Sequence, residues 1–423
     1  MIDTTLLEEL RPLGERFAAA GHRLYLVGGV VRDQLLGRPL AVGDDVDLTT
    51  DARPPAIKRL VSELASAVWT QGERFGTIGC RIEGRDYEIT THRGEVYHPD
   101  SRKPHVEYAD DVEHDLSRRD FTVNAMAAVV PTGELIDPFG GVTDLDAHRL
   151  RTPLAPEESF SDDPLRMLRA ARFIAGYELV PVPGLASAVR ALAGRITIVS
   201  VERCRVELDK LLVLPQPEPG LRFLVETGVL AQVVPGGPTA TPAAVEAAIA
   251  RVAGVPPRLA LRLAAFLHDP AHPHRAEVRS ALRRLRHSNE DTRAVLQLVD
   301  AWQVAVDHDG PWRAGDVRRL AHLAGAALDD VIALARVQHA ATGLEAAVAA
   351  AREADDLDDL EPELDGGAVM AALGLNEGPE VGAALAFLGD LRLTEGRLGA
   401  EEATRRLKAW WADRIRRSRS GRD

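Results

Sequence analysis

The stretch that decides the fold begins Val27-Gly28-Gly29-Val30-Val31-Arg32-Asp33 and resumes after a short linker as Gly43-Asp44-Asp45-Val46-Asp47-Leu48. An apolar run leads into two glycines, and a helix-like segment with an arginine in its first turn follows. Glycines let backbone N–H groups approach a phosphate without a side chain in the way. The order of these elements therefore predicts a phosphate-binding turn at Gly28 and Gly29.

Two carboxylates follow this turn in a strand-like run. Side chains two residues apart on a strand point to the same face, so Asp45 and Asp47 can both reach one or two Mg²⁺ ions. Such a pair suits a two-metal phosphoryl or nucleotidyl transfer. Taken alone, Gly-Gly is usually a plain turn and Asp-x-Asp a solvated strand end; together and in this order they are far more specific.

The hydrophobic pattern of the sequence changes along the chain. Leu6 to Ala19 predicts an amphipathic helix, and from Asp163 onward the pattern is helical almost to the end. Between them lie short runs typical of strands, at Leu24–Val27, Val46–Thr50, Thr77–Ile82, Tyr87–Thr91 and His105–Tyr108. We predict an α+β protein, with an N-terminal mixed β-sheet and helices followed by an all-α remainder.

Breaks in the helical part suggest its divisions. Pro/Gly-rich segments lie at Pro215–Gly220 and Pro235–Pro238, and an acidic run spans Glu353–Asp365. We expect divisions at residues 1–145, 146–213, 214–365 and 366–423, and the family resemblance carried by the motifs below implies that these are a catalytic head, a helical neck, a helical body and a helical, RNA-binding tail.

Composition excludes several classes of protein. The 423 residues contain 51 Lys+Arg and 64 Asp+Glu, a net charge of −13, which rules out binding to nucleic acid by bulk charge alone but leaves local arginine faces. Two cysteines cannot build a disulfide scaffold, and a reduced cytoplasm is the simple interpretation. We expect neither a secretory signal at the acidic N-terminus nor a transmembrane helix, because no long apolar window lacks charge.

Several motifs resemble one family. GGVVRD at 28–33 followed by DVDLTT at 45–50 resembles the opening motif of the nucleotidyltransferase superfamily, in its bacterial tRNA nucleotidyltransferase/poly(A) polymerase branch (class II CCA-adding enzymes). RFGTIG at 74–79, YEITTHR at 87–93, DLSRRDFTVNA at 115–125 and DPFGG at 137–141 follow in the family's order. His92 stands where the family usually has Phe.

The resemblance assigns roles to residues of the head. It implies that Asp45 and Asp47 hold Mg²⁺ and are catalytic, and that Arg119 contacts the nucleotide. Gly28, Gly29 and Arg32 would line the triphosphate. Glu88 is either a third carboxylate of the metal site or a structural strand residue.

The segment FSDDPLRMLRAARF at 160–173 has a local and a functional interpretation. Locally, Asp163 fits an N-cap, Pro164 fits the first helical position, and Arg166 begins a solvated arginine face. By resemblance, Asp163 and Arg166 occupy the family's E-D-x-x-R motif, in which a carboxylate and a guanidinium read the edge of C or A. Asp162 stands where Glu is common. Arg169 and Arg172 match further nucleotide-binding arginines.

The family contains several reactions. CC-only enzymes have a shortened loop after the T-T-F-R strand, whereas Thr90 to Pro104 is full length here, which argues against CC-only addition. We therefore expect a template-independent enzyme that adds CMP, CMP and AMP to a tRNA 3′ end from CTP and ATP. The alternative is an A-only-adding enzyme or a poly(A) polymerase. We expect no membrane or DNA partner.

Two other classes of protein fit the sequence less well. A small-molecule nucleotidyltransferase would not need the long helical half, and a non-catalytic RNA-binding protein would not need Asp45 and Asp47.

His268-Asp269 resembles a remnant of an HD phosphohydrolase motif, and we interpret it as a helix end. The arginines between Arg275 and His287 fit either an RNA-backbone contact or a solvated helix face, and the basic end around Trp410 and Trp411 fits either an RNA contact or a frayed terminus.

Overall fold

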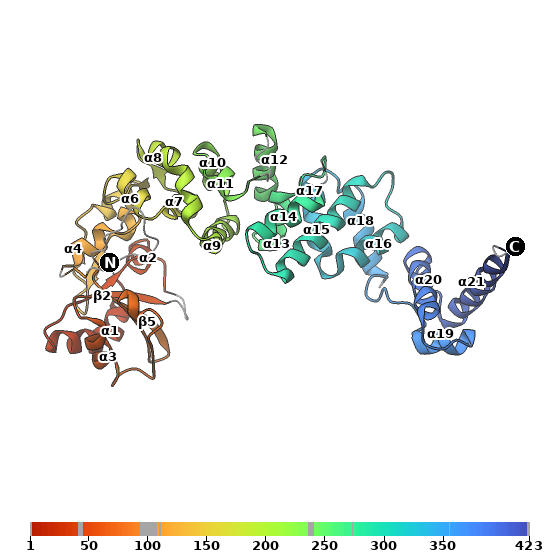
Figure 1. The fold of residues 1–423 in the computed structure, drawn as a ribbon, viewed down its shortest axis with the longest axis horizontal. Helices are drawn as coiled ribbons and strands as arrows, with labels where there is room; N and C mark the ends of the chain where they lie inside the picture. The colour runs from red at the N-terminus through yellow and green to blue at the C-terminus, as the bar shows by residue number, and fades with distance from the viewer. Residues whose placement is uncertain are drawn as a thin grey trace. The chain divides into compact units, whose positions relative to one another are not determined.

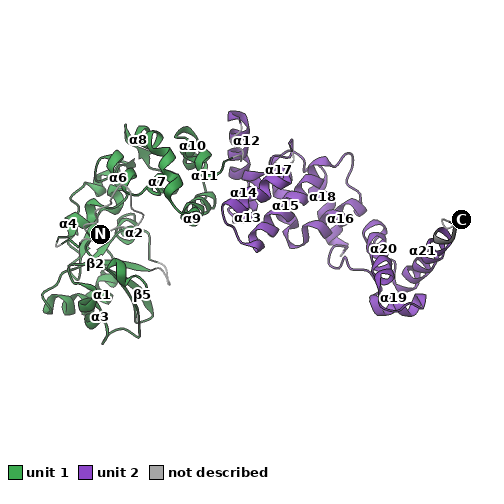
Figure 2. Cartoon of the chain, in the orientation of Figure 1, with its two compact units in different colours: residues 1–235 green, residues 236–423 purple. Residues whose placement is uncertain are grey.

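A computed structural model of the chain describes residues 2–40, 45–93, 108–109, 111–235, 241–272, 274–354 and 356–420. The chain divides into two compact units, residues 1–235 and 236–423 (Figure 2). The first unit contains a sheet and helices, and the second is helical throughout its described residues (Figure 1). The α+β prediction is therefore confirmed. The finer division into head, neck, body and tail stays a prediction.

One mixed sheet organises the N-terminal part of the first unit. Its seven strands lie in the order β3-β4-β5-β2-β1-β6-β7. Only the central pair β2·β5 is parallel, and every other neighbouring pair is antiparallel. The strands are β1 (Leu24–Val27), β2 (Val46–Thr50), β3 (Ala67–Trp69), β4 (Thr77–Ile82), β5 (Arg85–Thr91), β6 (Ala127–Val129) and β7 (Leu135–Ile136).

Two apolar clusters cover the two faces of this sheet. On one face, α1 (Thr4–Ala19) and α3 (Pro54–Val61) pack on strand residues such as Leu26, Leu48 and Ile89 in the main core. On the other face, Tyr25 and Val27 pack with residues of α4 (Val112–Ser117). Burial on both faces is typical of a sheet's central strands, and it explains the all-buried pattern of β1.

The strand predictions were accurate where apolar runs were clear. Strands β1, β2 and β4 have the expected bounds, and β5 begins two residues earlier than expected, at Arg85. Strand β3 was missed because its side chains are largely exposed and carry no alternation. Of the run 105–108, only Tyr108 is described, and it forms a bridge with Arg93.

Helices complete the first unit after the sheet. They are α2 (Gly29–Leu35), which follows β1, and, after α4, α5 (Gly141–Asp146), α6 (Pro156–Asp162), α7 (Arg166–Tyr177), α8 (Leu185–Leu192), α9 (Val201–Leu212), α10 (Glu218–Glu226) and α11 (Val229–Val233). A short parallel pair, β8 (Arg149–Leu150) and β9 (Val180–Pro181), lies beside them. Helix α7 packs between α9 and α10.

The predicted break at Pro215–Gly220 is shorter than expected. Pro217 caps α10, so Pro219 and Gly220 lie inside that helix. A Cβ on Gly220 would come within 2.4 Å of the Ala171 carbonyl oxygen. Glycine is therefore required there by the close approach of α10 to α7 and does not mark a turn.

The second unit consists of helices α12 (Pro242–Ala253), α13 (Leu259–Leu267), α14 (Arg275–Arg284), α15 (Asn289–Asp307), α16 (Ala314–Ala324), α17 (Leu328–Val337), α18 (Leu344–Glu353), α19 (Gly366–Leu373), α20 (Pro379–Glu395) and α21 (Ala400–Ser420). The predicted acidic run falls between α18 and α19. His268 caps the end of α13, as expected, and its Nε2 pairs with Gln303 at 3.0 Å. None of the helices in the described ranges is long and apolar enough to cross a membrane.

The basic C-terminal segment is an ordered helix over its described length. Trp410 stacks on Phe387 of α20 with ring centroids 4.9 Å apart, and Arg406 pairs with Glu402 and Glu395. The segment is therefore helical up to Ser420, and the aromatic stack and the ion pairs attach its first half to α20; its predicted contact with RNA stays a prediction.

Candidate active site

The predicted glycine turn joins β1 to α2. Gly28 has φ +76°, a left-handed conformation that L side chains rarely adopt. A Cβ on Gly28 would lie 2.9 Å from Arg119 Nη1 and 3.8 Å from Asp47 Oδ2. Both the backbone conformation and the space above it therefore require glycine, which leaves a small cradle between a guanidinium and a carboxylate.

The carboxylates lie on one face of β2, as the alternation predicted. Val46 and Leu48 are buried in the core, whereas Asp45 and Asp47 are exposed. Glu88 is the register partner of Asp47 on the parallel strand β5, so its side chain lies on the same face.

The pKa values of Asp47 and Glu88 are both raised. Restricted hydration in the pocket raises the pKa of Asp47, with Asp45 adding to the rise and Arg119 opposing it. Partial burial raises the pKa of Glu88, and Asp47 and Asp45 add to the effect. Crowded acidic groups of this kind are stabilised by a cation.

The donor set fits a divalent metal ion held partly by substrate. In the described part of the chain, no three acidic, histidine or cysteine side chains gather closely enough to hold one ion. Mg²⁺ commonly uses one or two carboxylates together with substrate phosphates, and Asp45 and Asp47 beside the Gly28 cradle meet that pattern. A role for Glu88 as third ligand stays a prediction.

Two adjoining cavities meet at this face. One, of about 300 Å³, is lined by Gly28, Gly29, Asp47, Arg119, Asp120, Asn124, Asp163, Leu165, Arg166, Arg169 and Arg203. The other, also about 300 Å³, shares Asp47, Arg119 and Arg166 and reaches Arg93 and Asp115. The structure thus brings seven of the predicted nucleotide-binding and catalytic residues to one pocket, namely Gly28, Gly29, Asp47, Arg119, Asp163, Arg166 and Arg169.

Arg119 stands between the two cavities with spare donor capacity. Its Nη2 donates to Asp115 Oδ2 at 3.3 Å, while its buried Nε has no partner among the described residues. A buried, unpaired N–H is costly unless a ligand accepts from it. This geometry suits an incoming phosphate oxygen.

Asp163 and Arg166 are held at the pocket by the turn before α7. Asp163 Oδ1 accepts from Leu165 N at 3.1 Å, and i→i+3 bonds close the turn. The helix proper begins at Arg166, two residues later than predicted, because this first turn is of the tighter 3₁₀ kind. Asp163 therefore caps the turn, and its Oδ2 also accepts from Arg203 at 3.2 Å.

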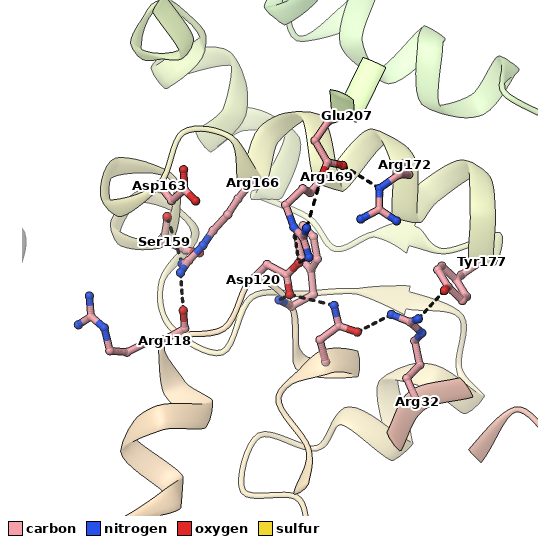
Figure 3. Close-up of polar contacts among 12 residues, drawn as sticks. Arg32, Arg118, Asp120, Ser159, Asp163, Arg166, Arg169, Arg172, Tyr177 and Glu207 are labelled. Atoms are coloured by element: carbon pink, nitrogen blue, oxygen red, sulfur yellow. Dashed lines mark hydrogen bonds and ion pairs between the residues drawn. The ribbon is translucent and has the colours of Figure 1, made fainter. Parts of the chain in front are cut away.

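The Arg166 guanidinium spans two segments. Its Nη1 donates to Ser159 Oγ at 2.8 Å, and its Nη2 donates to the Arg118 carbonyl oxygen (Figure 3). The side chain is thus fixed in place against both α6 and the head, with its edge on the pocket.

Arg169 and Arg172 form ion pairs with buried carboxylates. Arg169 contacts Asp120 at 2.6 Å and Glu207 of α9 at 3.4 Å, and Arg172 Nε donates to Glu207 Oε2 at 2.7 Å (Figure 3). Burial alone would raise the pKa of Asp120, but the charge of Arg169 and a hydrogen bond from Asn124 lower it to about 2. Of these two arginines, only Arg169 lines the pocket.

Arg32 is buried and is not among the residues that line the pocket. It donates to Asn124 Oδ1 at 2.5 Å, to Asp33 and to the Tyr177 hydroxyl, and it lies 4.1 Å from the Tyr177 ring centroid. It ties α2 to the far end of α7. Its predicted contact with a triphosphate stays a prediction.

His92, the departure from the family pattern, is a core residue. It is 1% exposed, its Nδ1 lies 2.9 Å from Thr49 Oγ1, and its ring packs on Tyr25. Burial lowers the pKa of His92, which keeps the ring neutral.

Sequence reasoning missed the buried partners of the arginines. Asn124 lies within the quoted motif at 115–125, yet spacing does not show which arginine Asn124 or Glu207 contacts. The full-length loop at 94–107, the segment that argued against CC-only addition, lies outside the described residues, as do Gly43 and Asp44.

The comparisons define the class of protein. Residues 24–151 match the family described as Poly A polymerase head domain, and residues 183–239 match the one described as Probable RNA and SrmB-binding site of polymerase A. The first of these matches places a poly(A) polymerase-type head domain at residues 24–151, where the quoted motifs lie, and the second places a segment similar to that polymerase's RNA-binding site after it.

The names of individual similar proteins are more specific than the two family descriptions. The chain is 38% identical over 222 residues to a CCA-adding enzyme of Latilactobacillus sakei and 39% identical over 209 residues to one of Bacillus subtilis. These alignments cover 52% and 49% of this chain and 54% and 51% of the relatives, so the chain spans about half the length of the curated relatives it matches. The crystal structure of the Bacillus stearothermophilus CCA-adding enzyme in complex with CTP is similar at 26% identity, with a TM-score of 0.75 over 97% of this chain and 98% of that one.

Because the pKa of Asp120 is lowered in the folded protein, the free energy of unfolding should depend on pH. A carboxyl group with a folded pKa of about 2 and an unfolded pKa near 3.9 contributes about 2 kcal/mol above pH 5, which is lost as the pH falls toward 2, about half of it by pH 3. The urea midpoint of wild type should therefore fall more steeply between pH 5 and pH 3 than that of Asp120→Asn. Asp146→Asn, at an exposed position, is the control and should follow wild type. Parallel curves for wild type and Asp120→Asn would contradict the burial of an ionised Asp120.

Proposed function

We propose that the chain is a template-independent tRNA nucleotidyltransferase that adds CMP, CMP and AMP to the tRNA 3′ end from CTP and ATP, releasing pyrophosphate. The observation that carries this proposal is one pocket in which Asp163 and Arg166 from the neck face Gly28, Asp47 and Arg119 from the head. The same pocket thus combines groups for holding phosphate with groups for reading a base. The likeness in fold to an enzyme solved with CTP supports it.

The residues divide the chemistry between them. Asp45 and Asp47 would hold Mg²⁺, which supplies positive charge to the attacking 3′-hydroxyl and the leaving pyrophosphate. The turn at Gly28 and Gly29 offers backbone N–H groups to the phosphates, and Arg119 donates from its unpaired Nε.

The adjoining cavities suit two substrates. The cavity with Asp163 and Arg166 would take the nucleotide, and the one that reaches Arg93 and Asp115 would take the RNA 3′ end. Asp47, which lines both, is then placed between the attacking hydroxyl and the α-phosphate. Holding two reactants side by side accounts for a large part of the rate of such reactions.

Base choice would rest on hydrogen-bond polarity. Asp163 accepts from the exocyclic amine of C or A, and Arg166 donates to the adjacent ring nitrogen. Uracil and guanine present the opposite pattern there and would leave buried groups unpaired. Arg32 and Arg172, which do not line the pocket, would act as positioning residues through Asn124, Tyr177 and Glu207.

The remaining parts of the proposal concern the RNA and the location. We infer that the neck, body and tail grip the acceptor stem by its shape and phosphates, since an A-form helix hides its deep groove. The two buried, free cysteines are compatible with a reducing cytoplasm. The runner-up activity is A-only addition or poly(A) synthesis on the same site.

Incorporation assays test the reaction and its catalytic centre together. Transcripts of tRNA ending before CCA, at C and at CC are incubated with single NTPs; the proposed enzyme adds C to the first two and A to the third. Asp47→Asn should lower incorporation of both bases by at least about 100-fold while tRNA binding persists, because the metal-holding carboxylate is gone. Asp86→Asn, on the neighbouring strand but paired with Arg81, is the matched control. A-addition alone, or A-tailing of unrelated RNA, would favour the runner-up; normal turnover by Asp47→Asn would remove Asp47 from the centre.

Asp163→Asn tests base selection separately from capping. Asn keeps an oxygen for Leu165 N but can also present an amide donor to the base, so the preference for CTP over UTP should fall about 10- to 100-fold. The comparison is kcat/KM for the four NTPs. Arg203→Gln breaks the same Asp163 ion pair and should keep the preference for C and A. Unchanged selectivity at full rate in Asp163→Asn would leave it only a structural role.

A further inference from the structure

A further cavity adjoins the candidate active site on the face of the sheet that carries the carboxylates. It has a volume of about 240 Å³ and is lined by Trp69, Gln71, Gly72, Phe75, Thr77, Gly79, Glu88 and Arg93. We call it the Trp69 pocket. Arg93 also lines the cavity that contains Asp47 and Asp115, so the two cavities meet at this arginine.

The strand register places the Trp69 pocket in line with the carboxylates. Asp47 of β2 is the register partner of Glu88 on β5, and Glu88 lies opposite Gly79 on β4. Gly79 in turn lies opposite Trp69 on β3. Residues opposite each other on neighbouring strands share a face of the sheet and are about 5 Å apart. The four residues therefore form one row that runs from the proposed Mg²⁺ ligand Asp47 to an aromatic side chain.

Gly79 allows the Trp69 side chain to lie over the neighbouring strand. A Cβ on Gly79 would lie 1.8 Å from Trp69 Nε1 and 2.1 Å from its Cε2, so the indole occupies space that any other side chain would need. One side of the ring is thus against β4, and the side turned away from the sheet lines the pocket. A fixed, half-buried aromatic face of this kind is a platform on which a nucleobase can stack.

The second wall of the pocket is held in place by the turn before β4. Phe75 ends the short helix η1 (Glu73–Phe75), and Glu73 forms an ion pair with Lys58 of α3 at 2.6 Å. Phe75 is 36% exposed, and the guanidinium of Arg74 lies 4.5 Å from the centroid of its ring. Because bases stack on arginine planes as well as on aromatic rings, this wall offers a further flat surface.

The position of the pocket indicates which reactant it takes. The cavity proposed for the incoming nucleotide is lined by Asp163 and Arg166, but not by Glu88 or Trp69. The base of that nucleotide therefore has its own site, and the Trp69 pocket is left for a base of the other reactant, the RNA. Its volume suits one unpaired base. Arg93, held by a 2.8 Å hydrogen bond to Thr77 Oγ1, stands where the two cavities meet and can bind a phosphate there.

We propose that the Trp69 pocket binds the last base of the RNA 3′ end by stacking on Trp69, and that this contact positions the attacking 3′-hydroxyl beside Asp47. The proposal rests on the proposed function for the identity of the RNA. Stacking tolerates any base, because every base has a flat face. One pocket can therefore accept in turn the ends before CCA, at C and at CC.

Substitutions of Trp69 in the full-length protein test the contact. Trp69→Ala should lower kcat/KM for the RNA about tenfold or more with all three transcripts, because the stacking surface is lost. The KM for CTP and the preference for CTP over UTP should stay unchanged. Trp69→Phe should recover most of the loss. Val68→Ala, at the adjacent and 39% exposed position of β3, is the matched control and should behave as wild type.

A transcript whose last nucleotide lacks its base separates stacking from a structural role of Trp69. Wild type should use this abasic end about tenfold less efficiently than the ordinary end, whereas Trp69→Ala should use both ends equally, because the ring is already absent. No penalty for the abasic end in wild type, or the same penalty in wild type and Trp69→Ala, would overturn this proposal. A wild-type protein that adds nothing to any ordinary transcript would instead overturn the proposed function.

Discussion

The buried carboxylate of Asp120 is the constraint on which the candidate site depends. It accepts from Arg169 at 2.6 Å and from the Asn124 amide at 3.0 Å, and it also caps the backbone of Phe121. An ionised group at this depth is stable only when paired and fully hydrogen-bonded. Asp120 therefore fixes α7 of the neck against the head in one arrangement.

The rest of the site follows from that attachment. With α7 held by Asp120, Glu207 binds Arg169 and Arg172 from the opposite side, and Arg32 reaches Tyr177 at the far end of the helix. The start of α7 then has a single position, which places Asp163 and Arg166 on the pocket that contains Asp47. The groups that we propose to hold phosphate and to read the base come from different segments of the chain, so their separation is set by this buried network.

The distribution of arginines shows how one residue type serves two purposes. Arg169, Arg172 and Arg32 have their charge neutralised or shared inside the protein, and they act as structural cations. Arg119 keeps a buried Nε–H without a protein partner among the described residues. This unpaired N–H marks the place where we propose that a phosphate binds.

Local patterns in the sequence predicted much of this site. They did not predict which residues far apart in the sequence pair with one another. The strand–Gly-Gly–helix unit and the shared face of Asp45 and Asp47 follow from periodicity, and both were confirmed. The partners of Arg169 could not be predicted, because Asp120 and Glu207 lie 49 and 38 residues away and only the fold brings them together. The inward direction of Arg32 and the stacking of Trp410 on Phe387 also depend on neighbours that spacing does not reveal. The two-residue delay in the start of α7 arises from a 3₁₀ turn that capping residues alone do not distinguish from an α-helix.

A double-mutant cycle between Asp120 and Arg169 tests the central claim that their contact positions the base-reading turn. The quantity measured is kcat/KM for CMP incorporation in Asp120→Asn, Arg169→Gln and the combined variant. If the two side chains act as one unit, the double variant should be no worse than the more impaired single variant, with a coupling of about tenfold or more. Losses that simply multiply would contradict the account, because they would mean that Asp120 and Arg169 contribute independently.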